Sequence, residues 1–318
     1  MAAILITGGS SGIGLCCLRE LAKASPNTII ISASRTAPPE LLPFNVRHLG
    51  LDLSSRKSVQ SLVRTWSYGP LAALICNAGM APGLDKPTYD SDGVELCFAV
   101  NYLNQALLFF LLKEKDLLAH PCRLVFLPTA LHDPKQPLNQ SPAFWPDTET
   151  VARAFVKDLS PRLVRYSTAK LGTIFFAYAL DAKLQAAAAA AKVAKAPLPD
   201  REWTVLAYEP GFIPSGGSRL QRDQPAVLRF IMAYIVPYML WFFTSKGIVT
   251  STPPISGKAL ADIAVNRTYA NVSGKYILDK EWKSSEESYD TEKQRELWNW
   301  TIDALAKDAS QKQRFESF

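Results

Sequence analysis

The sequence is poor in the residues that form metal centres and disulfide frameworks. Its three histidines lack the spacing of a metal-ligand pair, so we expect no metal site. Its five cysteines include the adjacent pair Cys16-Cys17 but no C-x-x-C motif. Because the count is odd, and because Cys76 and Cys122 fall in predicted buried strands, we expect reduced thiols in a cytoplasmic protein.

Clusters of like charge are also missing. The net charge is +6, but no block of Lys and Arg resembles a nucleic-acid footprint, so we expect no nucleic-acid partner. The mild positive charge fits an anionic cofactor or a membrane surface, or it serves solubility alone. No internal repeat is present. The glycine-rich turn described below begins so close to residue 1 that we expect no signal or transit peptide.

The most apolar part of the chain is not free of charge. The most apolar stretch, 226–243, has nearly the minimum spanning length but contains Arg229 and Pro237. It is interpreted either as short helices covering an apolar substrate pocket or as a monotopic patch that contacts a membrane. We favour the first interpretation and expect a lid over 212–254, with peripheral membrane contact through 226–243 as the alternative.

What the 318 residues do contain is an alternation of strands and helices that fits one large α/β domain. Apolar runs predict seven strands, at 2–6, 28–32, 46–48, 71–76, 122–127, 204–208 and 275–278. With helices between them, they predict a single Rossmann-type domain over 1–318. Its core is a doubly wound parallel seven-stranded sheet with helices on both faces.

Three segments depart from this alternation. The segment 130–165 is polar and rich in proline, and it is either an excursion over the active-site mouth or poorly ordered. The helix predicted from Tyr166 to 191 ends in an exposed run of alanines, followed by a linker at 196–200. The residues 281–318 predict a C-terminal helical extension that packs one face on the body.

The central motif is a glycine-rich turn, TGGSSGIG at 7–14, between the first predicted strand and a helix over 15–24. In this arrangement free backbone N–H groups and a helix N-terminus meet a pyrophosphate. Gly8 permits the tight turn, Gly12 allows close backbone approach, and Gly14 lets the helix pack against the strand. The alternative interpretation is a flexible loop between a strand and a helix.

Residues at later strand ends bear on the choice of cofactor. The second strand ends at Arg35 with no acidic residue, which favours a 2′-phosphate over a free 2′-hydroxyl, and NADP(H) over NAD(H). Asp52 is a candidate partner for the adenine amino group, a cap for the following helix, or both. The small-residue turn Asn77-Ala78-Gly79 lets the backbone lie against the cofactor.

Tyr166 and Lys170 are four residues apart, so they share one face of a helix. A nearby ammonium favours the phenolate and lowers the tyrosine pKa from about 10 toward the working pH. Tyr166 is then the group that exchanges a proton with a carbonyl or alcohol oxygen. Thr129 is a candidate to hold that oxygen, and Asn101 to position a water that relays protons to Lys170. His132 is the first alternative proton donor.

In combination, these motifs resemble the classical short-chain dehydrogenase/reductase family, in particular its retinol-dehydrogenase-like branch. The matching segments are TGGSSGIG at 7–14, NAG at 77–79, DGVELCFAVNYL at 92–103, YSTAK at 166–170 and PG at 210–211. The segment SSEESYD at 284–290 extends the likeness toward the C-terminus.

The resemblance implies a Rossmann fold, a nicotinamide cofactor and a catalytic tetrad of Asn101, Thr129, Tyr166 and Lys170. The cofactor-binding residues that it implies are Thr7, Gly8, Ser10, Ser11, Gly12, Ile13, Gly14, Arg35, Asp52, Leu53, Asn77, Ala78, Gly79, Tyr166, Lys170, Pro210, Gly211, Ile213 and Ser215. The chain departs from the family pattern at Thr129, where Ser is usual, and at Ser215, where Thr is usual. The span from Thr129 to Tyr166 is also unusually long.

The leading hypothesis is an NADP(H)-dependent oxidoreductase, a ketoreductase or alcohol dehydrogenase of secondary metabolism. The bulky apolar side chains of 226–243 favour a large apolar substrate, such as a polyketide, terpenoid, steroid or retinoid-like compound. The alternatives are a non-catalytic NADP(H)-binding regulatory or interaction protein and a membrane-bound scaffold. Either a monomer or a homodimer is expected, since relatives often pair through the helices that carry Asn101 and Tyr166.

Overall fold

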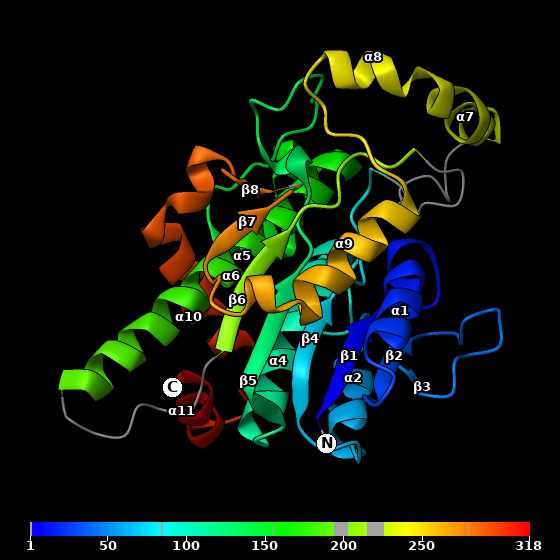
Figure 1. Ribbon diagram of the computed structural model, residues 1–318. Helices are drawn as coiled ribbons and strands as arrows, with labels where there is room; N and C mark the ends of the chain where they lie inside the picture. The colour runs from blue at the N-terminus through cyan, green and yellow to red at the C-terminus, as the bar shows by residue number, and fades with distance from the viewer. Residues whose placement is uncertain (1, 84, 155, 194–202, 215–225, 279) are drawn as a thin grey trace.

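The computed structural model describes residues 2–83, 85–154, 156–193, 203–214, 226–278 and 280–318. They form an α/β fold around one eight-stranded sheet with the strand order β3-β2-β1-β4-β5-β6-β7-β8 (Figure 1). The strands are β1 (Ala3–Thr7), β2 (Ile30–Ser34), β3 (Val46–Gly50), β4 (Leu71–Cys76), β5 (Leu118–Phe126), β6 (Trp203–Tyr208), β7 (Lys275–Ile277) and β8 (Glu281–Trp282). The helices are α1 (Gly12–Ala24), α2 (Arg56–Arg64), α3 (Leu96–Phe98), α4 (Asn104–Glu114), α5 (Thr148–Arg153), α6 (Arg162–Val193), α7 (Ala226–Phe230), α8 (Leu240–Ser245), α9 (Pro253–Val265), α10 (Thr291–Leu305) and α11 (Ala309–Glu316).

Seven of the strands, β1 to β7, are parallel, so the predicted doubly wound sheet is confirmed. The two-residue strand β8 is an addition, and it pairs antiparallel with β7. Because β8 is so short, it has no alternation of side chains that a sequence pattern could reveal. The strand β1 lies between β2 and β4, so the chain reverses its direction of winding there. In open α/β sheets ligands bind at the carboxyl ends of the strands beside this point.

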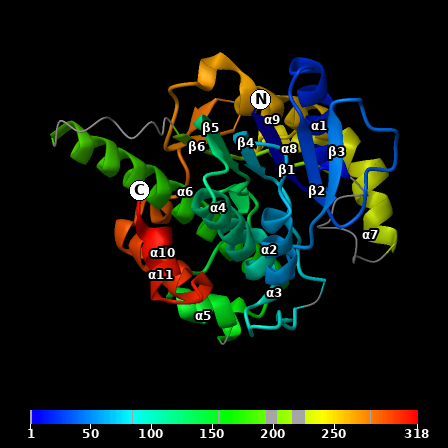
Figure 2. The same ribbon diagram turned by 90° about the horizontal axis from the view of Figure 1, so that it is seen from below.

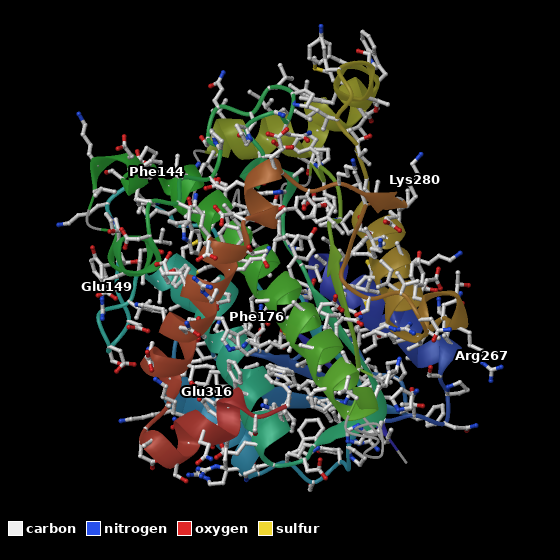
Figure 3. The ribbon with its side chains drawn as sticks, turned by 90° about the vertical axis from the view of Figure 1, so that its left-hand side faces the viewer. Phe144, Glu149, Phe176, Arg267, Lys280 and Glu316 are labelled. Atoms are coloured by element: carbon white, nitrogen blue, oxygen red, sulfur yellow. The ribbon has the colours of Figure 1, made fainter. Side chains whose placement is uncertain are left out.

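Helices cover both faces of the sheet, as predicted (Figure 2). The buried residues of α1 and α9 form a core on one face, and those of α2, α4 and α6 form a larger core on the other. In the larger core, Phe176 lies midway along α6 (Figure 3), and its ring contacts aromatic rings from α4, β5 and α10. This packing anchors the middle of α6 against the sheet and α10.

The segment 130–165 is ordered where the structure describes it, so the interpretation of a poorly ordered segment is wrong. Its helix α5 begins at the N-cap Asp147, whose carboxylate accepts a hydrogen bond from the Thr150 N–H at 2.8 Å. Trp145 is buried, with its ring 4.9 Å from that of Phe175 in α6. Burial of a tryptophan accounts for the order of this proline-rich segment.

The C-terminal extension packs on the outer side of α4 and α6. Trp298 of α10 stacks on Phe176 with ring centroids 5.3 Å apart. Phe315 of α11 stacks on Phe110 of α4 at 4.8 Å. The predicted extension is thus a second helical layer, and α4 is buried from Asn104 to Lys113.

Several predicted bounds and segments differ from the structure or fall outside it. The helix predicted from Tyr166 begins at Arg162. Residues 186–191 form the exposed end of α6, as predicted, whereas the linker at 196–200 lies outside the described residues. The poly-alanine end is helical because alanine has the highest intrinsic helix propensity.

The apolar stretch 226–243 folds as short helical pieces, α7 and α8 among them, at the top of Figure 1 and away from the sheet. Within the described residues, two other stretches are long and apolar enough to cross a membrane, Leu96–Glu114 and Arg162–Val193. The first is almost wholly buried, whereas the second is α6 itself, and 39% of its most apolar window is buried. A mostly buried core helix such as the first satisfies the same criteria of length and composition as a membrane-spanning helix.

Candidate active site

A cavity of about 890 Å³ lies at the carboxyl ends of the central strands. Its lining combines the glycine-rich turn with the ends of β4, β5 and β6, the start of α6 and the loop after α8. Of the predicted site residues, those that line it are Gly8, Ser11, Gly12, Ile13, Gly14, Asn77, Ala78, Gly79, Thr129, Tyr166, Lys170, Pro210, Gly211 and Ile213. The fold therefore brings most of the predicted cofactor and catalytic residues to one cavity.

The glycine-rich turn leaves an open face of backbone toward this cavity. Gly8 and Gly12 have φ values of +72° and +55°, which glycine adopts without strain. A Cβ at Gly12 would meet no atom within 4 Å, whereas a Cβ at Gly14 would lie 2.3 Å from the Gly8 carbonyl oxygen. The helix α1 begins here with no acidic residue in its first turn, and the Ser11 side chain makes no capping bond. This end of α1 fits the diphosphate of a nicotinamide dinucleotide.

Thr7 lies beneath this turn and does not line the cavity. Its hydroxyl donates to the Gln105 Oε1 atom at 3.0 Å and accepts from the Ala78 N–H at 2.9 Å. The Asn77 amide donates to the Thr7 carbonyl oxygen at 2.8 Å. Thr7 thus fixes the turn after β4 against the end of β1, and its contact with a cofactor stays a prediction.

Asn101 lies in a π-helical turn, Ala99–Leu103, between α3 and α4. Its Oδ1 atom accepts from the Met80 N–H at 2.8 Å, and its Nδ2 atom donates to the Met80 carbonyl oxygen at 2.7 Å. The Nδ2 atom also lies 2.9 Å from the Cys97 sulfur. The water relay from Asn101 to Lys170 stays a prediction, and a Cβ at Gly79 would lie close to both Asn101 Oδ1 and Lys170 Nζ. Asn101 also fixes the loop at Met80, and π-helical turns are frequent at functional sites.

Tyr166 and Lys170 stand together on α6, as their spacing predicts. The Lys170 Nζ atom donates to the Leu127 carbonyl oxygen at 2.6 Å and lies 6.0 Å from the centroid of the Tyr166 ring. A hydrogen bond joins the Thr129 side chain to the Tyr166 phenol. A Cβ at Gly79 would lie 2.7 Å from Asn101 Oδ1 and 3.3 Å from Lys170 Nζ, so the turn after β4 passes close to both side chains.

The protonation of these groups differs from the sequence prediction. Burial raises the pKa of Tyr166 above its ordinary value, Glu209 acts in the same direction, and the Thr129 hydrogen bond lowers it. A tyrosine pKa lowered by Lys170 is therefore not found, because desolvation of the phenolate is the larger effect. Burial lowers the pKa of Lys170 to about 8. Tyr166 is thus a protonated phenol at neutral pH and is ready to donate its proton.

His132 is not available as the alternative proton donor. Its Nδ1 atom lies 2.6 Å from the Thr129 carbonyl oxygen, and its Nε2 atom accepts from the Ser285 N–H at 3.0 Å. Burial lowers the pKa of His132, so the ring is neutral with its proton on Nδ1. His132 links the backbone of Thr129 to the C-terminal extension.

Glu209 is a residue of the cavity wall that sequence reasoning missed. It follows β6 directly, is 3% exposed and lines the cavity. Burial raises the pKa of its carboxyl to about 7. A sequence signal was present, because an acidic residue stands directly before Pro210-Gly211 at the end of a predicted buried strand.

The residues predicted to bind the adenosine half lie outside this cavity. Arg35 is exposed directly after β2, at the end of the strand, as predicted. The Asp52 carboxylate accepts from the Ser54 N–H at 2.9 Å, whereas the N-cap of α2 is Ser55, so the prediction that Asp52 caps this helix is wrong. The other predicted residues that do not line it are Ser10 and Leu53, and Ser215 lies outside the described residues.

Comparisons with known proteins found similar sequences and a similar fold. A family model described as short chain dehydrogenase matches residues 2–109, and one described as AcuH dehydrogenase domain matches residues 219–311. The chain is 28% identical over 252 residues to Dehydrogenase/reductase SDR family member FEY of Arabidopsis thaliana, covering 74% of this chain and 60% of that protein. It is 26% identical over 314 residues to Retinol dehydrogenase 13 of Mus musculus, covering 93% and 81%. The chain thus spans less than two thirds of the Arabidopsis relative.

A solved structure shares the fold. The crystal structure of an uncharacterized protein from Mycobacterium Paratuberculosis superposes with a TM-score of 0.67 at 19% identity, covering 96% of this chain and 93% of that one. At this identity the likeness concerns the fold alone.

Proposed function

The chain belongs to the classical short-chain dehydrogenase/reductase superfamily, and from that premise we propose an NADP(H)-dependent oxidoreductase that interconverts a carbonyl and an alcohol. The observation that carries the proposal is the convergence of Thr129, Tyr166 and Lys170 with the open glycine-rich turn on one cavity. When bound, a nicotinamide cofactor supplies or accepts the hydride. The residues of the glycine-rich turn would hold its diphosphate, and the turn at 77–79 would lie along it.

In the direction of reduction, the chain's own residues supply the proton and its orientation. The Tyr166 hydroxyl gives its proton to the carbonyl oxygen of the substrate, with the Thr129 hydroxyl holding that oxygen. The Lys170 ammonium, fixed by the Leu127 carbonyl, stabilises the negative charge left on the phenol. In the direction of oxidation, the same groups take the proton from an alcohol.

We propose a bulky apolar substrate, such as a polyketide, terpenoid, steroid or retinoid-like compound. The lining supports this class, because one wall of the cavity is largely apolar. The apolar residues outside the glycine-rich turn include Met80, Leu131, Leu138, Leu163, Phe212, Phe243 and Ile248. Pockets of this kind bury most of the surface of a drug-sized ligand.

A turnover assay tests the proposal. NADPH consumption is followed with a panel of bulky ketones and aldehydes, and NADPH formation with the matching alcohols. We expect turnover with at least one member and loss of it in Tyr166→Phe. A protein that binds NADPH but converts no member in either direction would support the alternative, a non-catalytic NADP(H)-binding regulatory or interaction protein.

The preference for NADP(H) is proposed from Arg35. Its side chain is exposed at the end of β2, where an acidic residue would repel a 2′-phosphate. Titration calorimetry should show tighter binding of NADPH than of NADH, and Arg35→Asp should reverse the order. Arg64→Asp, an exposed arginine on α2, is the control for a change in overall charge. Equal affinity of the parent for both cofactors contradicts this assignment.

We also propose that this enzyme is cytoplasmic and contacts an anionic membrane surface through 226–243. Large side chains there face solvent, with Tyr234, Tyr238 and Trp241 exposed by 64%, 82% and 71%. Aromatic residues of this kind favour the membrane–water interface. Between Asp223 and Asp262 the sequence contains basic residues but no acidic one, which complements anionic lipid.

Sedimentation with vesicles tests the membrane contact. The parent should sediment with phosphatidylserine-containing vesicles at low salt and much less with neutral vesicles. The double variant Tyr238→Ser/Trp241→Ser should lose this binding. The control Leu41→Ser/Phe44→Ser, which removes side chains exposed by 98% and 78% in the loop before β3, should retain it. If both double variants sediment alike, 226–243 is not the membrane contact. If the parent instead forms a concentration-dependent dimer that Tyr238→Ser/Trp241→Ser abolishes, these side chains contact a second copy of the chain.

A further inference from the structure

The cavity contains a buried acid for which the proposed chemistry has no use. We propose that Glu209 is a positioning residue that supplies the counter-charge of Lys170 and holds the loop of Thr129 in place. This inference rests on the proposed function for its catalytic consequence. Its electrostatic part can be measured without turnover.

The placement of Glu209 follows from the register of the sheet. Phe126 of β5 is paired with Ala207 of β6, and Tyr208 of β6 with Ile277 of β7. Glu209 therefore leaves the sheet between the ends of β5 and β7. The Lys170 ammonium is bonded to the carbonyl of Leu127, the first residue after β5. Both charges thus converge on the same strand end.

The hydrogen bonds of Glu209 are those of an ionised carboxylate. Its Oε1 atom accepts from the Gly211 N–H at 3.1 Å, and its Oε2 atom accepts from the Tyr276 hydroxyl at 3.4 Å. The carboxylate also accepts from the Ala130 N–H. A carboxylate only accepts, whereas a protonated carboxyl must also donate, so three donors match the ionised form. Through Ala130 and Gly211 the same group fixes the residue after Thr129 and the turn after Pro210.

Lys170 needs a counter-charge because it is 4% exposed. Three groups favour its charged form, namely Cys97, Glu209 and Cys76. Burial raises the pKa of both thiols, so neither carries a charge at neutral pH. Glu209 is the member of this set that ionises near neutrality, and a buried ammonium without a partner is strongly unfavourable.

The other titratable groups that act on Glu209 stay neutral in this range. Tyr166 on α6, Tyr276 on β7 and Tyr208 on β6 all have raised pKa values, with burial as the main cause. The ionisation of Glu209 and Lys170 should therefore determine how activity depends on pH near neutrality. Burial places the pKa of the carboxyl at about 7 and that of the ammonium at about 8. Both are charged between these values, and this is the window in which we expect the highest activity.

The first experiment measures these charges in the protein without substrate. Glutamate and lysine are labelled with ¹³C at the side-chain end, and the two resonances are assigned by their absence in Glu209→Gln and Lys170→Met. In the parent, one glutamate should titrate near pH 7 and one lysine near pH 8. In Glu209→Gln the lysine midpoint should fall by on the order of one pH unit, since the favourable charge is lost. Glu286→Gln, at an exposed acid, should leave it unchanged.

The second experiment uses the pH profile of kcat/KM. The parent profile should fall on its acid side as Glu209 is protonated and on its alkaline side as Lys170 loses its proton. In Glu209→Gln the fall on the acid side should disappear, and the fall on the alkaline side should move to lower pH. Glu209→Asp should restore the fall on the acid side. A merely structural role would lower the melting temperature of Glu209→Gln and leave both sides of the profile in place, which would overturn the inference.

The two experiments separate this inference from the proposed function. If the Lys170 midpoint shifts in Glu209→Gln but the parent shows no turnover, Glu209 is the counter-charge of Lys170 and the proposed oxidoreductase activity is wrong. If the parent shows turnover, but Glu209→Gln shifts neither the pH profile of kcat/KM nor the Lys170 midpoint, the proposed activity stands and Glu209 is not the counter-charge of Lys170. If Glu209→Gln does not fold, Glu209→Asp serves for the assignment, and a Glu209 carboxyl that is still protonated at pH 8 contradicts the inference.

Discussion

The phenol of Tyr166 is subject to opposing effects on its proton. Burial and the charge of Glu209 favour the protonated form, and the Thr129 hydrogen bond favours the phenolate. Since burial is the largest of these effects, the free protein holds a proton donor at neutral pH. A donor in this position suits reduction of a carbonyl better than oxidation of an alcohol.

The first prediction concerns a variant that lacks the Tyr166 hydroxyl and therefore its proton. Tyr166→Phe keeps the ring and loses the hydroxyl, so NADPH affinity should be retained while kcat falls by on the order of 10²–10⁴-fold. Stopped-flow measurement of NADPH oxidation and calorimetric titration of NADPH provide the two readouts. Thr129→Ser should remain active and Thr129→Val should not. Near-parent turnover by Tyr166→Phe would refute the mechanism, since His132 has both ring nitrogens engaged.

A buried ion pair beside the site supports the second prediction. Arg165 of α6 lies 3.1 Å from Glu95, and both side chains are 2% exposed. Arg165 also donates to the Leu159 carbonyl oxygen at 3.2 Å, which ties the segment 130–165 to α6. Arg165→Leu leaves the Glu95 carboxyl buried without its partner and should cost about 3–5 kcal/mol of unfolding free energy.

Urea unfolding followed by circular dichroism measures this loss. The control is Arg295→Leu, which breaks an exposed pair with Glu292 and should change stability by less than about 1 kcal/mol. An equal and small loss in both variants would show that the buried pair contributes nothing specific.

At the scale of elements, α6 combines two different environments. Its first half is buried and carries Tyr166 and Lys170, whereas its second half ends in exposed alanines. By contrast, the short pieces between 226 and 243 leave most of their described large side chains exposed. The site therefore lies between the buried first half of α6 on one side and, on the other, a segment with few buried side chains. Low contact density is typical of segments that open locally.

The third prediction is that the segment 226–249 exchanges its amide hydrogens quickly in the free protein. Addition of NADPH and a bulky apolar inhibitor should slow this exchange, because Phe243 and Ile248 line the cavity. Hydrogen exchange detected by mass spectrometry provides the measurement, with the amides of β4 as the slow internal reference. Uniformly slow exchange without ligand would identify the segment as a fixed core element and reject the lid.

Much of the sheet and of the cavity could be predicted from the sequence because both depend on local signals. Buried parallel strands are continuous apolar runs, and the left-handed Gly8 and Gly12 require glycine. The roles of Asn101 and His132 could not be predicted, since each is set by hydrogen bonds to Met80 or Thr129. The pKa of Tyr166 depends on burial, which no spacing of residues reveals.

At the scale of the whole molecule, the C-terminal extension closes the outer surface of α4 and α6. Beyond the stacking of Phe315 on Phe110, the Lys113 ammonium donates to the Phe315 carbonyl oxygen at 2.8 Å. It also lies 3.9 Å from the centroid of the Phe318 ring. These contacts cover the outer surface of α4 and α6, where the family resemblance leads us to expect any pairing.

The last prediction is that the protein is a monomer in solution. Sedimentation equilibrium should give the mass of one chain, 35.1 kDa, over a wide range of concentration. A second copy cannot dock on α4 unless α11 first leaves, and that would expose Phe110 and Phe315 to water. Phe315→Ala should therefore cost about 3–5 kcal/mol of unfolding free energy without producing a stable dimer. A dimer of the parent protected from hydrogen exchange along α4 and α6 would show that the extension opens to allow pairing.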